Sequence, residues 1–532
     1  MFKQVACTIL ALSSLAKAQA PAIAPAAPAG PRLILLDVIV NSDKGPTRGL
    51  TKDDFIVEDK GKKQNLAIFQ VTESGKMGTP TALPAGVASN RFNSKGEAQQ
   101  TATIVLYDRI NSGAEDQAFV RAQILRLLTG LKDTDRVGFY SLGFNLKIVR
   151  DYNEDAGPLA KVAKALQQST TVPDAFSPPE KALFKDLTDA LSPMQQLQNQ
   201  ARVNITYPAF RSIGRHLSGV IGRKNLLWVT SVFPLTYGNS VERRKNDQAE
   251  VDGFKANLTD ANIALYPVDP GGTGASFNQT GAAPVANEGS LMPGAQRNQA
   301  GTSSMNNTDS SLTGNQTMLL LADATGGKAY RNANDITPAL REVTAAADYT
   351  YTLGFYPDAK TLDSKFHDLK VTLAKKPATD KAKVSHRKQY LAWAPDTPAA
   401  ADLKPTMGEL LEDQALSNGV GLLGVVNPDP TKPGFQTIDL RISAGDLRFE
   451  PRADKWVAGF DIAISIEGLK GASMKTYAPQ LAAEQVAAVI ASGMDIRETL
   501  DTGGSSGVFR INILDKFSGA SGALRIPFTG TK

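Results

Sequence analysis

The sequence predicts an α/β domain with a doubly wound, mainly parallel sheet, inserted in a split β-sandwich and followed by a C-terminal all-β sandwich. Three observations lead to this fold class. Apolar strands alternate with helical patterns over residues 100–345, the order expected for a parallel sheet covered on both faces. Short strands at 31–75 and 346–393 flank this unit, and neither group makes a stable sheet by itself. Residues 433–529 show strand patterns only.

The composition is that of a globular protein with several domains, since 42% of its 532 residues are hydrophobic and 21% are charged. One cysteine and three histidines are too few for a Cys-based or multi-His metal centre. The formal charge of +5 is small and evenly spread, which argues against a nucleic-acid partner. Beyond the N-terminus we find no 18-residue uncharged apolar run, and therefore expect no integral membrane segment.

The N-terminus has the features of a signal peptide over residues 1–20. Lys3 precedes a short apolar run, Val5–Ala16, and two A-x-A cleavage sites follow. Residues 21–30 form a Pro/Ala linker, which argues against the alternative of a buried N-terminal helix. Cleavage would remove the cysteine and two lysines and lower the formal charge to +3. We therefore expect an exported protein, secreted to the periplasm or the extracellular space.

The first β module covers residues 31–75, and a linker is expected at 76–99. Its first strand is a nearly continuous apolar run that only Asp37 interrupts. We expect these strands to pair with those at 346–393, so that the α/β unit is an insertion between them.

The α/β unit should contain four buried strands, at Thr103–Tyr107, Val137–Leu142, Leu226–Phe233 and Ile263–Val268. Helices are expected around Ile124–Leu131, Leu159–Leu166 and Ala249–Ala261. Residues 270–316 are rich in Gly, Ser, Asn and Thr with few charges, so we expect a flexible insertion there. A polar substrate-binding loop is the alternative. A linker at 394–432 should then lead to the C-terminal β-sandwich, in which Phe460, Ile462, Ile464 and Ile466 alternate with period two.

Several segments, taken in order over about residues 33–392, resemble a family of exported bacterial proteins, abundant in acidobacteria, that carry a von Willebrand factor A-related domain. The matching segments are LLDVIV, GLTKDDFIVEDKGKKQ, LYDRIN, DTDRVGFYSL, GRKNLLWVTSVFP, DANIALYPVD, ATGGKAY, YTLGFYPDAKTLDSKFHDLKVTL and HRKQYLA. The segment VFRINILDKFSG resembles the C-terminal β-sandwich of some relatives. The resemblance implies an A-type fold that binds a protein ligand.

The resemblance also implies a metal-ion-dependent adhesion site, whose pattern is Asp-x-Ser-x-Ser, a Thr and a second Asp. Asp108, Ser112 and Thr206 stand at matching positions, whereas Ile110 replaces the middle Ser and Ser231 replaces the second Asp. Because Mg²⁺ prefers six oxygen ligands, this is a degenerate site for that cation.

Asn111 or Glu115 could compensate for the missing oxygens. The alternative is structural: Asp108 accepts hydrogen bonds at a strand end and Thr206 caps its helix. Beyond Mg²⁺ at this site we expect no cofactor.

We therefore expect a non-enzymatic protein-binding or cell-adhesion module, whose binding surface is the C-terminal edge of the parallel sheet. Its partner would be a protein ligand or an envelope component. A structural or envelope-assembly scaffold without metal-dependent binding is the second hypothesis. The third is a hydrolase, for which His216 is the best candidate base if an acid lies near it, although we find no Ser–His–Asp set in the sequence.

Overall fold

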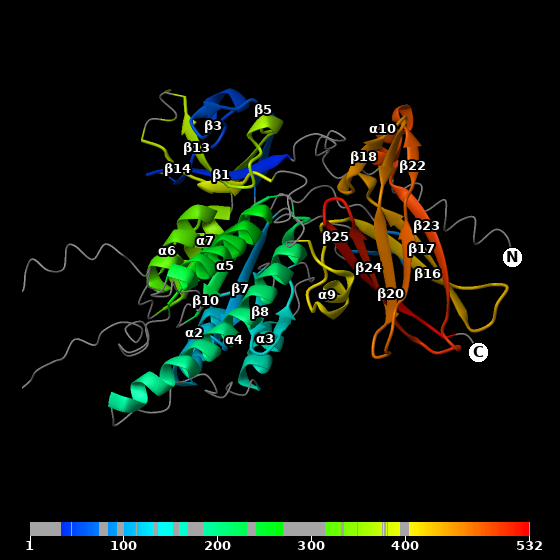
Figure 1. Cartoon of the computed structure of the whole chain (residues 1–532), viewed down its shortest axis with the longest axis horizontal. Helices are drawn as coiled ribbons and strands as arrows, with labels where there is room; N and C mark the ends of the chain where they lie inside the picture. The colour runs from blue at the N-terminus through cyan, green and yellow to red at the C-terminus, as the bar shows by residue number, and fades with distance from the viewer. Residues whose placement is uncertain are drawn as a thin grey trace, which may run out of the picture.

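The structure is a computed structural model, shown in Figure 1. It describes residues 33–43, 45–73, 83–92, 101–112, 114–131, 137–152, 159–168, 185–220, 222–230, 241–269, 314–330, 335–347, 349–374, 376, 379, 381–393 and 404–530. The expected signal peptide, the Pro/Ala linker and residues 270–313 of the expected insertion lie outside these ranges, and residues 314–316 begin a helix. Among the described residues, no helix is long and apolar enough to cross a membrane.

The N-terminal β module is built from two segments of the chain. Its strands are β1 (Ile34–Ser42), β2 (Gly45–Pro46), β3 (Phe55–Asp59), β4 (Lys62–Lys63), β5 (Leu66–Glu73), β12 (Tyr349–Phe355), β13 (Phe366–Leu373), β14 (Lys383–Ser385) and β15 (Gln389–Leu391), with 3-10 turns η1 (Lys52–Asp54) and η2 (Ala359–Thr361). One sheet has the order β14-β1-β12-β5 and the other β15-β13-β3-β4. β1 pairs antiparallel with β12, and β3 pairs antiparallel with β13. The strands at 31–75 and 346–393 therefore do pair, and side chains of both sheets share one core.

Asp37 interrupts the apolar run of β1 because this strand is covered on two sides. Leu36, Val38 and Val40 face the core between the two sheets of the module. Asp37 lies on the opposite face, which is directed toward the α/β domain, where it accepts a hydrogen bond from Asn262. The nearly continuous burial of β1 therefore reflects both contacts.

The α/β domain has a central sheet of order β11-β10-β7-β8-β9. Its strands are β7 (Ala102–Asp108), β8 (Val137–Leu142), β9 (Leu146–Arg150), β10 (Lys224–Val229) and β11 (Ile263–Val268). Its helices are α2 (Ala114–Thr129), α3 (Leu159–Gln167), α4 (Lys185–Leu217), α5 (Val241–Asp260), α6 (Gly314–Thr325) and α7 (Thr337–Ala347). All strand pairs are parallel except β8 with β9.

Helices cover both faces of this sheet, which explains why its strands are nearly continuous apolar runs. Alternate residues such as Ile104 and Trp228 pack with α4, α5 and α6 in one core cluster. Their neighbours, such as Val105 and Leu227, pack with α2, α3 and α7 in a second cluster.

The C-terminal β module follows α9 (Met407–Glu412). Its elements are β16 (Leu422–Pro428), β17 (Phe435–Ile442), η4 (Ala444–Asp446), β18 (Phe449–Arg452), β19 (Lys455–Ala458), β20 (Phe460–Ile466), β21 (Ser473–Tyr477), β22 (Gln480–Ala482), α10 (Ala483–Ser492), β23 (Met494–Asp501), β24 (Gly507–Asp515) and β25 (Ser521–Phe528). The sheets β23-β17-β16-β6, in which β6 is Ala88–Ser89, and β21-β20-β24-β25 contribute side chains to a single core. A smaller sheet is formed by β18-β19-β22.

Two predicted linkers contain ordered strands, so those two predictions are wrong in part. β16 and α9 lie within 394–432, and β6 (Ala88–Ser89), which lies within 76–99, pairs with β16. Glycines made the β16 segment look like a linker. A Cβ at Gly424 would lie only 2.7 Å from Ile526 Cδ1, so the glycine here allows close packing of the strand.

The two β modules both contact the N-terminal edge of the central sheet, where its parallel strands begin. Asn262, just before β11, donates to Asp37 of the N-terminal module at 2.6 Å. Asn418, at the start of the C-terminal module, donates to Tyr152 Oη at 2.8 Å and accepts from the Gly219 amide at 2.6 Å. In Figure 1 the N-terminal module lies above the α/β domain, and the C-terminal module lies beside it.

Candidate functional site

Asp108 is the last residue of β7, at the C-terminal edge of the central sheet. Its carboxylate is completely buried. The chain then turns through residues 109–112 toward α2, and the backbone N–H of Asn111 donates to Asp108 Oδ1 at 3.0 Å. The Ser112 hydroxyl donates to the Asp108 carbonyl oxygen at 2.6 Å. Ser112 thus closes the turn and does not direct its oxygen toward the Asp108 carboxylate.

The side chain of Asn111 joins Asp108 to Thr206. Asn111 Nδ2 lies 2.7 Å from Asp108 Oδ2 and 2.8 Å from Thr206 Oγ1. Thr206 lies inside α4, so the expectation that it caps its helix is wrong. The structure therefore brings Asp108 and Thr206 to the same place, but through an amide that lies between them.

A tryptophan on the neighbouring strand supplies a further donor. Trp228 of β10 donates its indole N–H to Asp108 Oδ2 at 2.8 Å. Its ring is packed edge-on against Phe210 of α4, with ring centroids 4.9 Å apart. Thr230 Oγ1 donates to the Asn111 carbonyl oxygen at 3.3 Å. The strand end and the turn are thus held by side chains from β10 and α4 as well as by the turn itself.

Burial raises the pKa of Asp108 to about 6, and the hydrogen bonds from Asn111 and Trp228 oppose this shift. A carboxyl group that has lost its water needs donors from the protein. The donors named above meet this need, which confirms the structural expectation that Asp108 accepts hydrogen bonds at a strand end.

In this arrangement the residues do not fit a divalent cation. Two N–H donors already point at Asp108 Oδ2 and one at Oδ1, where a cation would need lone pairs. Ile110 is buried in the core cluster beside α4, so its side chain serves packing at the position where the pattern has a serine. Within the described ranges, no group of three or more His, Cys, Asp or Glu could hold a metal ion. Ser231 and the side chain of Glu115 lie outside the described residues.

Two residues at this edge were not singled out in the sequence. Trp228 could have been noticed as the polar-tipped aromatic near the end of the buried strand beside β7. Phe144 lies in the turn between β8 and β9, at the same edge, and is 55% exposed. An aromatic residue in the short Gly-Phe-Asn turn was the available signal.

His216 does have a carboxylate nearby. Its Nε2 lies 3.0 Å from Asp151 Oδ1, and its Nδ1 lies 2.5 Å from the Leu416 carbonyl oxygen. Asp151 also accepts from Tyr140 Oη at 2.7 Å. Burial lowers the pKa of His216, but the Asp151 charge and hydrogen bonds outweigh it and raise the pKa overall. Because both ring nitrogens face acceptors, neither is left to take a proton from a nucleophile.

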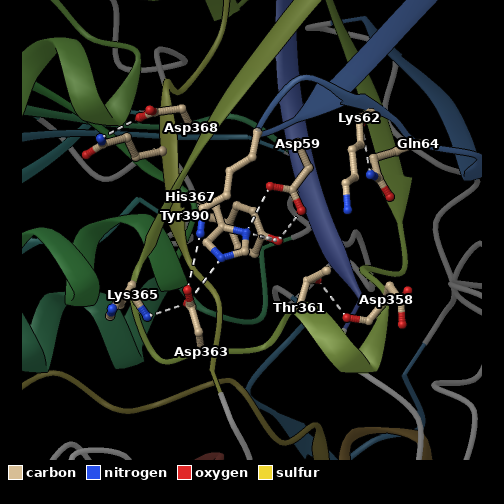
Figure 2. Close-up of polar contacts among 12 residues, drawn as sticks. Asp59, Lys62, Gln64, Asp358, Thr361, Asp363, Lys365, His367, Asp368 and Tyr390 are labelled. Carbon is tan, nitrogen blue, oxygen red and sulfur yellow. Dashed lines mark hydrogen bonds and ion pairs between the residues drawn. The ribbon is translucent and has the colours of Figure 1, made fainter.

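The other two histidines are buried in the N-terminal module (Figure 2). His367 Nδ1 lies 2.9 Å from Asp59 Oδ1, and His367 Nε2 lies 3.1 Å from Asp363 Oδ1. The Tyr390 hydroxyl donates to the other carboxylate oxygen of Asp59, Oδ2. His386 accepts from the Val371 amide through Nε2, and burial lowers its pKa to about 4. Each of these histidines links strands of the module.

A cavity of about 190 Å³ lies at the N-terminal edge, between the three modules. Its charged lining residues are Arg91, Asp446, Lys224, Arg387 and Asp260. Arg91 pairs with Asp446 at 3.0 Å, and Lys224 donates to the Val220 carbonyl oxygen at 2.7 Å. Arg91, Asp446 and Lys224 therefore already have ion-pair or hydrogen-bond partners.

Comparisons with known proteins identify no family. No family model and no curated protein match the chain. Among solved structures, a von Willebrand factor type A protein from Catenulispora acidiphila aligns over 88% of this chain and 75% of its own, with 10% identity and a TM-score of 0.19. The human COPII-coat protein Sec24c aligns over 82% of this chain and 44% of its own, with 10% identity and a TM-score of 0.22.

Similarity at this level establishes neither the acidobacterial family nor a function. The mixed α/β character of the chain rests on its own strand order and helix packing.

Proposed function

We propose that this chain is an exported, non-enzymatic protein-binding module with a von Willebrand factor A-like α/β domain. It binds a protein ligand or envelope component through the C-terminal edge of the sheet. The fold part of the proposal is supported by the parallel order β11-β10-β7-β8 with one antiparallel edge strand, β9. Export rests on the pattern of the N-terminal residues.

The observation that carries the proposal is a difference between the two edges of the central sheet: the β modules attach at one edge, and the other carries an exposed aromatic residue. Contacts of Asn262 with Asp37, of Arg387 with the Thr259 carbonyl oxygen and of Asn418 with Tyr152 attach both β modules at the N-terminal edge. The C-terminal edge, where open parallel sheets commonly bind ligands, carries the exposed Phe144 next to the ordered turn after Asp108. A large exposed aromatic side chain is a typical anchor for a protein partner.

A non-enzymatic role is supported by the state of the histidines. His216 and His367 each have both ring nitrogens within hydrogen-bond distance of carboxylate or carbonyl oxygens. A general base needs one nitrogen directed at the group that it deprotonates. This geometry therefore disfavours the hydrolase hypothesis.

Capture of proteins from a cell-envelope extract tests the binding face. The Phe144→Ser variant should capture the partner at least about tenfold less well than the wild type. Loss of an aromatic side chain that becomes buried in the complex commonly costs more than about 1.4 kcal/mol of binding energy. Leu469→Ser is the matched control, because Leu469 is 66% exposed on the C-terminal module. Capture that survives Phe144→Ser, or that is lost with Leu469→Ser, would contradict the proposed face.

An envelope-assembly scaffold is the second candidate function. It is favoured by the largely buried ion pair between Arg215 of α4 and Asp413, 2.6 Å apart, which helps hold the C-terminal module against the α/β domain. In a scaffold, partner capture should depend on this junction. Arg215→Ala would then abolish capture, whereas Phe144→Ser would leave it unchanged.

A further inference from the structure

The amide nitrogen of Asn111 occupies the point where the oxygens at the C-terminal edge converge. It lies within 2.8 Å of both Asp108 Oδ2 and Thr206 Oγ1, which come from β7 and α4. The three side chains are completely or almost completely buried. The two hydrogens of this one nitrogen can therefore satisfy two oxygens that no water reaches.

The orientation of the amide is determined by its neighbours. If the amide were flipped, Oδ1 would face the Asp108 carboxylate, and two acceptors would repel each other without water to separate them. In the observed orientation Oδ1 is buried without a hydrogen-bond partner among the described residues. The two hydrogen bonds that Nδ2 donates thus stabilise the site by more than the unpaired acceptor Oδ1 destabilises it.

We propose that the Asn111 amide, with the Trp228 indole, replaces a divalent cation at this edge, so that the binding face works without any metal ion. The amide does what a small cation would do there, because it places positive charge density between a carboxylate and a hydroxyl. The Trp228 N–H takes a further lone pair of Asp108 Oδ2. This inference deepens the proposed function, since it concerns the same edge of the sheet.

Thermal unfolding of the full chain in EDTA and in about 5 mM Mn²⁺ or Mg²⁺ tests the inference, since a ligand that binds only the folded state raises Tm. The wild-type Tm should be the same in all three solutions. A saturable rise with Mn²⁺ that Asp108→Asn removes would overturn the proposal.

Substitution of Asn111 supplies the positive test. Asn111→Asp replaces the donor by a carboxylate facing Asp108 and Thr206, so the variant should unfold at a lower temperature in EDTA. Mn²⁺ should then restore at least about 4 °C of Tm, because a cation can now bridge the oxygens. Asn111→Ala should lose stability without recovery. A destabilised Asn111→Asp that Mn²⁺ does not restore would contradict the inference.

Asn225→Asp is the matched control. Asn225 is also completely buried and lies on the adjacent strand β10, but at the opposite edge of the sheet. Its variant should show no recovery with Mn²⁺. If Asn111→Asp does not fold, the wild-type measurement still decides between the outcomes. These readouts involve no partner, so they fail or succeed independently of the Phe144→Ser capture experiment.

Discussion

The two edges of the central sheet each bury a carboxylate, and they differ in where its hydrogen-bond donors come from. At the N-terminal edge, Asp37 accepts from Thr352 at 2.7 Å and from Asn262 at 2.6 Å, so one donor is from its own module and one from the neighbouring domain. At the C-terminal edge, the donors to Asp108 among the described residues, Asn111 and Trp228, belong to the α/β domain itself. Burial raises the pKa of both carboxyl groups. The first edge is therefore an assembly junction, and the second is complete without the β modules.

Arg387→Ala should give the largest effect, because it breaks the assembly junction. Arg387 donates to the carbonyl oxygens of Leu35 and Thr259, and thereby bridges the N-terminal module and the end of α5. Truncation leaves one buried and one partly buried acceptor without this donor and should lower the free energy of unfolding by about 4 kcal/mol. Urea denaturation measures the change. Arg452→Ala, at a largely exposed arginine, is the control and should cost little. Equal losses in the two variants would show that the bridge is unimportant.

Acid should lower the stability of the N-terminal module, which takes part in the same assembly junction. His386 is buried with its pKa lowered to about 4, whereas an unfolded histidine has a pKa of about 6.5. The unfolded state therefore takes up a proton between pH 6.5 and 4 that the folded state does not, and stability falls by about 3 kcal/mol over this window. Below the pKa that His386 has in the folded state, both states are protonated, and the contribution of His386 to the free energy of unfolding falls no further.

The His386→Gln variant should lose this part of the pH dependence, since it cannot be protonated. Urea unfolding of wild type and variant at several pH values between 4 and 7 measures the difference. Parallel pH profiles would contradict the assignment to His386.

Trp228→Phe should give a smaller effect, confined to the C-terminal edge. It removes one of the donors to Asp108 Oδ2 and keeps the aromatic packing against Phe210, so we expect a loss of about 2 kcal/mol. Trp393→Phe is the matched control, because the Trp393 indole donates to Asp260 Oδ1 at an exposed site. Thermal or urea unfolding compares the two. If Trp393→Phe costs as much, the indole contact with Asp108 is not what stabilises this edge.

The sequence predicted the order of elements well where a strand is buried on both faces. The runs that became β7, β8, β10 and β11 are apolar at nearly every position, because helices cover the sheet on two sides. The pairing of the first strands with those near residue 350 was also foreseen, since neither group could form a sheet by itself. β16 was missed because Gly424 is required by close packing, which a sequence shows only as a break in the apolar pattern.

The candidate site was predictable only in part. Asp108 and Thr206 do lie on either side of the Asn111 amide, at one place, as the resemblance to the adhesion-site pattern implied. The roles of Asn111 and Trp228 could not be inferred, because they depend on which way an amide and an indole point in a packed interior. Ser112 was expected to direct its oxygen toward a cation, but its hydroxyl bonds to the backbone of the same turn.

The split construction of the N-terminal module determines the order in which the molecule can form. The hydrogen bond from Thr352 to Asp37 spans 315 positions of the chain, and that from Tyr390 to Asp59 spans 331. During synthesis, β1, β3 and β5 are made long before β12 and β13. The backbone groups of these early strands that later pair with β12 and β13 therefore have no partner strand at first. The intervening α/β domain can collapse first, and in doing so it brings the two ends of its own segment to one edge of the sheet. Folding of the α/β domain thus brings the early and the late strands of the N-terminal module close together, which lowers the entropy cost of pairing strands that are far apart in the sequence.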